Sequence, residues 1–429
     1  MTRPKVIILL IGNELVRGSV ADTNGSLAAR ELGRIGFGVV GFEIVGDDDQ
    51  AIERALRAGA EKAEVVIVGG GLGPTDDDRT RGAAARFFGR ELVFNPAAWE
   101  NIEAWFRNLK RKSAPDDRRQ AQFPAGAEMI PNRYGTAPGF FYRQSQTRYY
   151  FLQGVPREFS AVLEDEILPR LRKEFSLPPP PTFRTLKVFG LSEARVGAII
   201  FGLARSFPPV TVGTRFYFPE IWIDLESEDG KALEAVVSRA RSEFSSHLFG
   251  ENEERLESIV GKLLTEKGWK LALAESCTGG LVAHRITEVP GSSNYFERGV
   301  VTYSNPSKVE LLGVSPDLLK KFGAVSAEVA GAMAEGVKKI SGVEIGLSTT
   351  GIAGPTGGSP EKPVGLVYFG LATPEGVFTR QELLFGGRER IKTFASAVAL
   401  DWLRRYLKGE KQGVGSREPQ PLGCAPSKQ

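Results

Sequence analysis

The sequence predicts an α/β protein: two three-layer α/β/α domains with mainly parallel sheets, joined by a small α+β domain. Short apolar segments alternate with helical patterns at both ends of the chain, which is typical of βαβ units and parallel sheets. Four consecutive prolines at 178–181 separate the first such region from the rest, because proline cannot continue a helix or a central strand. A length of 429 residues suits about three domains.

The first domain is expected at residues 1–176. Its apolar runs predict strands at 5–11, 38–45 and 65–68. Apolar residues at helical spacing predict helices at 24–35, 50–60 and 157–173. Because these strands are short and separated by helices, we expect a mainly parallel sheet.

The second domain, residues 182–250, has a KH-like order of elements. Strands are predicted at 185–189, 210–216 and 221–226, with helices at 193–203 and 231–244. A nucleic-acid-binding KH module needs a G-x-x-G loop, but the loop at 190–193 has one glycine and ends in Glu193. We therefore expect a spacer or dimerisation role here, and no nucleic acid.

The third domain is expected at 251–408, with helices at 254–267 and 389–407 and a strand at 270–274. Residues 409–429 are rich in Gly, Pro, Gln and Lys and have almost no apolar side chains. Such a composition cannot build a core, so a disordered tail is predicted there.

Composition excludes several classes of function. Lys and Arg number 55 against 52 Asp and Glu, too balanced for a polybasic nucleic-acid or membrane surface. No apolar run approaches the ~20 residues of a spanning helix. Two Cys and two His argue against a disulfide framework, a Cys-based zinc site and a His-dependent triad. We expect a cytoplasmic protein whose chemistry uses carboxylates with a metal, or Ser, Lys and Tyr.

A glycine-rich loop at 69–80 follows the strand at 65–68. Glycines at the carboxyl end of a parallel strand let the backbone approach a phosphate. Asp77 and Asp78 add oxygen ligands of the kind that Mg²⁺ takes together with substrate oxygens. Alternatively these polar residues are turn and cap residues, and for Asp22 or Asn24 alone we favour a cap. For the loop as a whole we favour a ligand site.

A second polar loop, Glu275-Ser276-Cys277-Thr278-Gly279-Gly280, links the strand at 270–274 to a helix. Ser276 has the position of a nucleophile, although it or Thr278 could equally cap the helix. Cys277 has no visible activating partner, and we expect a small buried residue.

Two further strand ends support the nucleophile. Tyr303 and Lys308 follow the next strand, and Lys308 could act as a base if desolvation lowers its pKa. The glycine-rich loop at 351–358 has the composition of a phosphate or ribose cradle.

These motifs resemble the CinA family over about residues 4–405. The resemblance is carried by residues 22–24, 70–75, 135–139 and 154–158 in the first domain, and by 275–280, 301–305, 323–326 and 351–355 in the last. For the first domain it implies a MoaB/MogA-like, molybdopterin-related fold. It also implies metal-dependent hydrolysis of ADP-ribose to AMP and ribose 5-phosphate. Mg²⁺ or another divalent cation would bind Asp77 and Asp78. Substrate would contact Gly12, Glu14, Asn24, Gly70, Gly71, Gly73, Pro74 and Thr75.

For the last domain the resemblance implies an amidohydrolase of nicotinamide mononucleotide (NMN), working without a metal or other cofactor. Ser276 would be the nucleophile and Lys308 and Tyr303 would move protons, with Thr278 as a further catalytic candidate. Substrate would contact Glu275, Gly279, Gly280, Gly351, Gly354, Gly357 and Arg388. Arg388 could equally be an ordinary residue of the first helical turn.

The resemblance also implies a homodimer that acts on small-molecule nucleotides and not at a membrane. The alternative is a non-catalytic molybdopterin-related or competence-associated binding or adaptor protein. The sequence departs from the family pattern at Asp116, Asp117 and Gln153. These departures keep the alternative open for the first domain.

Overall fold

The computed structural model describes residues 3–410. The chain forms two compact units, Met1–Pro181 and Thr182–Gln429, and the division falls directly after the four prolines. The tail predicted at 409–429 lies, apart from its first two residues, outside the described residues. Within 3–410, no helix combines the length and the apolar character that crossing a bilayer requires.

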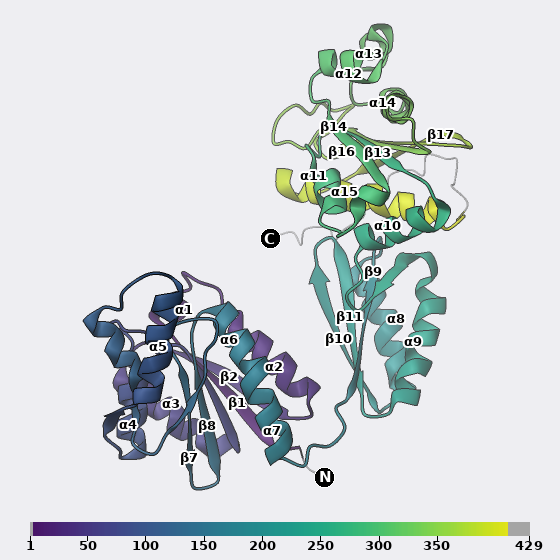
Figure 1. The fold of residues 1–429 in the computed structure, drawn as a ribbon. Helices are drawn as coiled ribbons and strands as arrows, with labels where there is room; N and C mark the ends of the chain where they lie inside the picture. The colour runs from purple at the N-terminus through teal and green to yellow at the C-terminus, as the bar shows by residue number, and fades with distance from the viewer. Residues whose placement is uncertain (1–2, 411–429) are drawn as a thin grey trace. The chain divides into compact units, whose positions relative to one another are not determined.

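A six-stranded sheet forms the centre of the first unit (Figure 1). Its strands are β1 (Lys5–Ile11), β2 (Gly38–Val45), β3 (Val65–Gly69), β6 (Glu128–Ile130), β7 (Gly139–Gln144) and β8 (Thr147–Leu152). They lie in the order β2-β1-β3-β8-β7-β6, and only β7 runs against the others. A separate ribbon pairs β4 (Leu92–Phe94) with β5 (Gln122–Pro124). The three predicted strands are confirmed.

Helices cover both faces of this sheet, which makes three layers. One face carries α2 (Asn24–Arg34), α6 (Pro156–Val162) and α7 (Leu168–Glu174); the other carries α3 (Asp49–Lys62), α4 (Thr80–Phe88) and α5 (Pro96–Asn108). Val6 and Ile8 belong to the core under α2, whereas Ile7 and Leu9 belong to the core under α3. Successive side chains of a strand point to opposite faces, so a strand covered on both sides must be apolar throughout.

The helix predicted at 157–173 is helical throughout but contains a π-helical turn at Leu163–Ile167, between α6 and α7. Pro169, in the first turn of α7, has no N–H to donate to the preceding turn, and a π-turn is one way to accommodate that loss. Four helical segments of this unit went unpredicted: α4, α5, the short helix α1 (Asn13–Val16) and the 3-10 turn η1 (Pro115–Ala121).

The second unit begins with an antiparallel four-stranded sheet in the order β10-β11-β9-β12. These strands are β9 (Thr182–Val188), β10 (Val210–Tyr217), β11 (Glu220–Ser227) and β12 (Leu248–Glu251). Both helices, α8 (Glu193–Arg205) and α9 (Gly230–Phe244), pack into one core with one face of the sheet. The α+β order predicted for this segment is confirmed, and a short 3-10 turn, η3 (Ser245–His247), precedes β12.

A five-stranded sheet completes the second unit. Its strands are β13 (Leu271–Glu275), β14 (Phe296–Val301), β15 (Ile345–Gly351), β16 (Leu366–Thr373) and β17 (Gly376–Leu383). They lie in the order β14-β13-β15-β16-β17, and only β16 runs against the others. The sheet is therefore mainly parallel, as predicted.

Two groups of helices enclose this sheet as a second three-layer arrangement (Figure 1). One face packs against α10 (Leu256–Lys267), α11 (Leu281–Thr287) and α15 (Arg388–Leu407); the other packs against α12 (Asn305–Leu312), α13 (Pro316–Phe322) and α14 (Ala327–Ser341). The 3-10 turn η4 (Ser292–Asn294) lies before β14.

Candidate functional site

Three polar loops meet at the carboxyl edge of the five-stranded sheet. Ser276 follows β13 and Thr302 follows β14 directly. The N–H of Ser276 donates to the carbonyl of Thr349 in β15 at 2.9 Å, and the N–H of Thr302 donates to that of Glu275 at 2.8 Å. The carboxyl ends of parallel strands are where open α/β sheets bind ligands. The loops predicted separately in the sequence therefore belong to one site.

Lys308 and Ser276 form the reactive pair of this site. Lys308 Nζ lies 3.3 Å from Ser276 Oγ, and the two residues are 1% and 8% exposed. The same nitrogen donates to the carbonyl oxygens of Thr302, at 2.8 Å, and Tyr303, at 3.3 Å. Two backbone carbonyls and the Ser276 hydroxyl therefore fix the position of the amine.

Burial lowers the pKa of Lys308, and only the Cys277 thiol opposes that shift. No carboxylate among the described residues pairs with this amine, because its three contacts are a hydroxyl and two carbonyls. A lysine with a lowered pKa is neutral at a lower pH than usual. Neutral Lys308 can accept the proton of Ser276. A pKa lowered by desolvation is what a lysine needs to act as a base.

Glu275 is tied to the backbone of the next helix. Its carboxylate accepts the N–H groups of Gly280 at 2.9 Å, Val282 at 3.1 Å and Ala283 at 2.8 Å, all at the start of α11. Between it and α11, Gly279 and Gly280 have φ of +61° and +92°, the left-handed region that favours glycine. The geometry shows a helix-capping role for Glu275. Its predicted substrate contact stays a prediction.

The other two residues of the motif are fully packed. Thr278 Oγ1 lies 2.6 Å from Thr349 Oγ1, and Thr278 is 0% exposed, so its hydroxyl faces a neighbouring threonine. Burial raises the pKa of Cys277 to about 12, which keeps the thiol protonated and unreactive. The expectation that Cys277 is a small buried residue is confirmed.

The glycine-rich loop after β15 contacts the start of α15. Gly351 ends β15, and Gly354 and Gly357 lie in the loop that leads to β16. Arg388, the first residue of α15, donates from Nη1 to the carbonyl of Gly354 at 2.8 Å. The structure therefore brings the predicted cradle and Arg388 together.

Tyr303 lies beside Arg388, with its hydroxyl away from Lys308. Arg388 Nη2 donates to this hydroxyl at 2.8 Å, and Tyr303 is 59% exposed. Lys308 contacts only the backbone carbonyl of Tyr303. One turn after Arg388, the ammonium of Lys392 lies 3.6 Å from where a Cβ on Gly279 would be. Lys392 was not predicted from the sequence, although its i+4 spacing from Arg388 was the available signal.

Glycine-rich loops also meet at the carboxyl edge of the six-stranded sheet. Gly12 donates to the carbonyl of Val45 at the end of β2, and Gly70 donates to that of Leu152 at the end of β8, both at 3.0 Å. Gly70 has φ +110°, and a Cβ there would lie 2.1 Å from the carbonyl oxygen of Ile11. Only glycine fits this close approach of the loops after β1 and β3.

Asp78 and a buried arginine hold the loop at 69–80. Asp78 Oδ1 accepts the N–H of Gly73 at 2.7 Å, and its Oδ2 accepts the N–H and hydroxyl of Thr75 at 2.9 and 2.6 Å. Arg81, unpredicted and 5% exposed, donates to the carbonyls of Leu72 and Gly73. Both oxygens of Asp78 are therefore engaged within the protein. Burial lowers the pKa of Arg81 to about 10.

The remaining predicted residues of this loop surround the turn that Asp78 holds. Gly71 has φ +66° and packs against Thr80, whose hydroxyl donates to the carbonyl of Gly70 at 2.8 Å. Pro74 lies between Gly73 and Thr75.

Acidic residues around the loop influence Asp47 electrostatically. Asp47, after β2, has a pKa raised by burial and by the negative charges of Glu14, Asp77 and Asp78. Asp77 is exposed, and local hydrogen bonding lowers its pKa. Among residues 3–410, no three His, Cys, Asp or Glu side chains are already arranged as a metal site. Metal binding by Asp77 and Asp78 stays a prediction.

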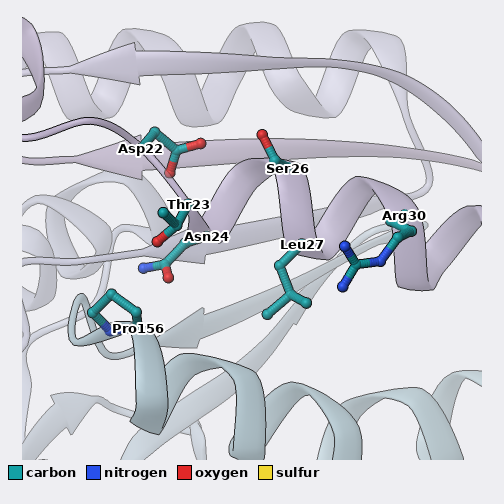
Figure 2. A pocket seen from close by; sticks show the side chains of 7 residues that line it. All are labelled: Asp22, Thr23, Asn24, Ser26, Leu27, Arg30 and Pro156. Carbon is teal, nitrogen blue, oxygen red and sulfur yellow. The ribbon is translucent and has the colours of Figure 1, made fainter. Parts of the chain in front are cut away.

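Asp22 and Asn24 have different roles at the start of α2 (Figure 2). Both oxygens of the Asp22 carboxylate lie 3.1 Å from the N–H of Gly25, so Asp22 caps the helix. Asn24 is buried, and its Nδ2 donates to the carbonyl of Gly154 at 2.8 Å. Asn24 thus reaches the loop after β8 and not its own helix end.

Both ends of the chain match known families. The CinA C-terminal domain matches residues 253–407, and a probable molybdopterin binding domain matches residues 7–173. A CinA-like protein from Geotalea uraniireducens is 43% identical over 411 residues, covering 94% of this chain and 97% of its own length. The chain belongs to the CinA family. The CinA assignment from sequence motifs is therefore confirmed.

Other relatives of this CinA chain carry names of a different kind. A putative competence-damage inducible protein from Moorella thermoacetica is 41% identical over 408 residues, covering 94% of this chain and 98% of its own. The crystal structure of the competence/damage inducible protein CihA from Agrobacterium tumefaciens is 40% identical, covering 36% of this chain and 95% of its own, with a TM-score of 0.34. These names state no reaction. A reaction for this chain must therefore be inferred from the side chains of the two sites.

Proposed function

We propose that the C-terminal domain hydrolyses the carboxamide of NMN to nicotinate mononucleotide and ammonia. The observation that carries the proposal is the buried Lys308 amine 3.3 Å from Ser276 Oγ, with no carboxylate of residues 3–410 paired to it that would hold it protonated. A serine hydroxyl is a weak nucleophile until a base removes its proton, and an amine of lowered pKa supplies that base without histidine.

The reaction proceeds in two halves. Neutral Lys308 takes the Ser276 proton as Oγ attacks the carboxamide carbon; the resulting ammonium then donates a proton to the nitrogen, which leaves as ammonia. The nicotinoyl ester on Ser276 remains. Lys308, again neutral, takes a proton from a water molecule that attacks the ester, and then returns a proton to Oγ as nicotinate mononucleotide leaves.

Two cations fit the phosphate of such a substrate. Arg388 and Lys392 lie one turn apart at the start of α15, next to Gly354 and Gly279. Arginine binds phosphate with its fork of donors, and lysine acts as a compact charge. We propose that they hold the 5′-phosphate and that Tyr303, hydrogen-bonded to Arg388, orients this pair.

Ammonia release from NMN tests the proposal. Wild-type protein should release ammonia, Ser276→Ala should not, and Ser293→Ala, an exposed serine, should behave as wild type. A folded wild type that releases no ammonia contradicts the proposal and favours the adaptor alternative. Activity in Ser276→Ala would move the nucleophile elsewhere, and loss in Ser293→Ala would show that the assay reports general damage.

For the N-terminal domain we propose hydrolysis of ADP-ribose to AMP and ribose 5-phosphate with Mg²⁺ or another divalent cation. The supporting observation is the glycine-rich loop at 69–80 with the exposed carboxylate of Asp77 in it, in an acidic region where burial and the negative charges of Glu14, Asp77 and Asp78 raise the pKa of Asp47. Hard carboxylate oxygens suit such a cation, which would neutralise the diphosphate. Asp77 and Asp78 would hold it, with Asp77 exposed and both oxygens of Asp78 also accepting hydrogen bonds within the loop.

A chelator tests the metal directly. AMP formation from ADP-ribose should stop with chelator and return with excess Mg²⁺. If chelator has no effect, the metal assignment is wrong; if no AMP forms at all, the adaptor alternative holds for this domain. Both substrates come from the breakdown of nicotinamide dinucleotides, and we propose a cytoplasmic homodimer that recycles them.

A further inference from the structure

We infer that the small α+β domain positions the start of α15, the segment proposed to bind the substrate phosphate, through the turn Phe218-Pro219. The inference rests on the amide hydrolysis proposed for the C-terminal domain. This turn joins β10 to β11, and Glu220 after it is the first residue of β11. The sequence predicts only a spacer or dimerisation role for this domain. Contacts of the turn with two helices of the candidate site point to a role in substrate binding.

The first turns of α15 have two faces with different neighbours. Arg388 and Lys392 are four residues apart, so they share one face, and both lie beside glycines of the candidate site. Arg390 and Phe394 are also four residues apart. Their face is turned by about 200° from Arg388, since 3.6 residues make one turn. The side of α15 away from the proposed phosphate ligands is therefore the side that Arg390 and Phe394 occupy.

This second face packs against aromatic side chains of the small domain. The ring centroids of Phe218 and Phe394 are 5.6 Å apart, and the two rings are nearly perpendicular at 84°. Phe189, after β9, makes another edge-to-face contact with Phe394 at 5.8 Å. The guanidinium carbon of Arg390 lies 4.2 Å from the centre of the Phe218 ring, within cation–π distance. Phe394 is 7% exposed, so the small domain helps to bury it.

The residue after the turn contacts a second helix of the site. Glu220, 8% exposed, lies 3.9 Å from Arg285 on α11 and accepts the indole N–H of Trp222 at 2.9 Å. Arg285 also pairs with Glu257 on α10 at 2.7 Å and donates to the hydroxyl of Ser396 on α15 at 3.1 Å. Because α11 begins directly after the loop that carries the nucleophile, the turn contacts both helices that adjoin the site.

The far end of α15 is held by the small domain as well. Arg404, 0% exposed, donates to the carbonyl of Ser246 at 2.6 Å and pairs with Asp401 at 2.7 Å. Arg405 donates to the hydroxyl of Ser246 at 3.0 Å. The small domain therefore contacts α15 near both of its ends, and loss of the contact at the turn would release only the first turns of the helix.

The start of α15 depends on such packing. Gly387, its N-cap residue, has no side chain to accept the free N–H groups of the first turn. Gly386 before it has φ +117°, so the chain enters the helix through two glycines. Without a side-chain cap, the position of the first turn is set by what packs against it. The Phe218 contact provides that packing and thereby fixes the two proposed phosphate ligands.

Steady-state kinetics of the full chain test this role. Phe218→Ala should raise KM for NMN about tenfold and preserve kcat, because the phosphate ligands shift while the Lys308–Ser276 pair stays in place. KM for nicotinamide riboside, which lacks the phosphate, should not change. Phe218→Tyr keeps an aromatic ring at the turn and should restore the wild-type KM. Phe201→Ala removes an exposed ring from α8 of the same domain and, as the matched control, should change neither constant.

A double-mutant cycle tests whether Arg390 acts through Phe218. Arg390→Met should raise KM for NMN by itself and add little to Phe218→Ala, because both changes remove the same contact. Fully additive effects would show that Arg390 acts independently of the turn and would overturn the inference. Arg390 is exposed, so Arg390→Met also decides the matter if Phe218→Ala does not fold: an unchanged KM for NMN then overturns the inference.

Further outcomes separate this inference from the proposed activity. An active Phe218→Ala protein with the wild-type KM for NMN overturns the inference and leaves amide hydrolysis standing. An equal rise in KM for both substrates, or a rise in Phe201→Ala, overturns it as well. A wild type that binds NMN but releases no ammonia contradicts the activity, and calorimetry then decides the inference. NMN should bind Phe218→Ala about tenfold more weakly than the wild type, and equal affinities would overturn the positioning role.

Discussion

Lys308 Nζ and Ser276 Oγ lie 3.3 Å apart in a buried site, although 32 residues separate them in the chain. The amine is held by the carbonyls of Thr302 and Tyr303, and the hydroxyl follows β13 directly. No histidine is among the hydrogen-bond partners of the Lys308 amine in the described residues. This arrangement joins a strand end to the first turns of α12, and every prediction for the C-terminal domain depends on it.

Lys308 should give amide hydrolysis its pH dependence. Because the neutral amine is the base, the rate should rise with pH to a plateau, and the inflection should lie below the ordinary lysine pKa of 10.5. Lys308→Met should reduce kcat by about 10²–10⁴-fold. Lys339→Met, an exposed lysine on α14, is the control. An inflection that survives in Lys308→Met would assign it to another group.

The same lowered pKa predicts how stability varies with pH. Between the folded-state pKa of Lys308 and 10.5, the unfolded state binds more protons than the folded state. The contribution of Lys308 to stability should therefore increase as pH rises through this window and decrease as pH falls. The unfolding free energy, measured with urea at several pH values, should rise less steeply with pH in Lys308→Met than in the wild type. An equal dependence on pH would contradict the effect of burial on Lys308.

Glu275 should support the nucleophile by fixing α11. Glu275→Gln exchanges an acceptor oxygen for a donor NH₂ that faces backbone N–H groups, so at least one of three hydrogen bonds is lost. We expect a loss of about 2 kcal/mol in unfolding free energy and a lower kcat. Glu288→Gln, exposed at the end of the same helix, should change neither. Wild-type stability in Glu275→Gln would show that the cap contributes little.

Lys392 should recognise the phosphate and take no part in the bond-breaking step. Lys392→Met should raise KM for NMN about tenfold and preserve kcat, because one charged contact made in both ground and transition states is lost. Its effect should disappear with nicotinamide riboside, which lacks the phosphate. Lys262→Met, exposed on α10, is the control. An equal effect on both substrates would place Lys392 away from the phosphate.

Asp77 and Asp78 should differ although they are adjacent. Asp78→Asn should lower both the stability of the first unit and AMP formation, because Asp78 accepts three hydrogen bonds that shape the loop. Asp77→Asn should lower AMP formation and leave unfolding unchanged, because Asp77 is exposed. Thermal unfolding alongside the AMP assay distinguishes them, and matching profiles would overturn this division of roles.

Local patterns in the sequence predicted part of each sheet, including three of the six strands in the first unit. The strands at 5–11 and 38–45 have the predicted bounds because both are apolar runs. The first is buried on both faces, whereas the second lies at the edge of the sheet and is only partly covered. The π-turn before Pro169 could not be predicted, since it depends on how the helix fits its neighbours. The capping role of Glu275 could not be predicted either, because its motif gave no sign that the carboxylate turns back onto α11.

The sequence by itself determined the α/β class, the proline boundary and the residue types available for chemistry, because apolar periodicity, proline and motif spacing are local properties. Only the tertiary structure decided which of those residues meet. It placed Lys308 against Ser276, joined the Tyr303 hydroxyl to Arg388, and brought Lys392 close to Gly279. The reason is physical: a site at the carboxyl edge of a parallel sheet is assembled from loops far apart in the chain, and the distances between them depend on sheet order and packing.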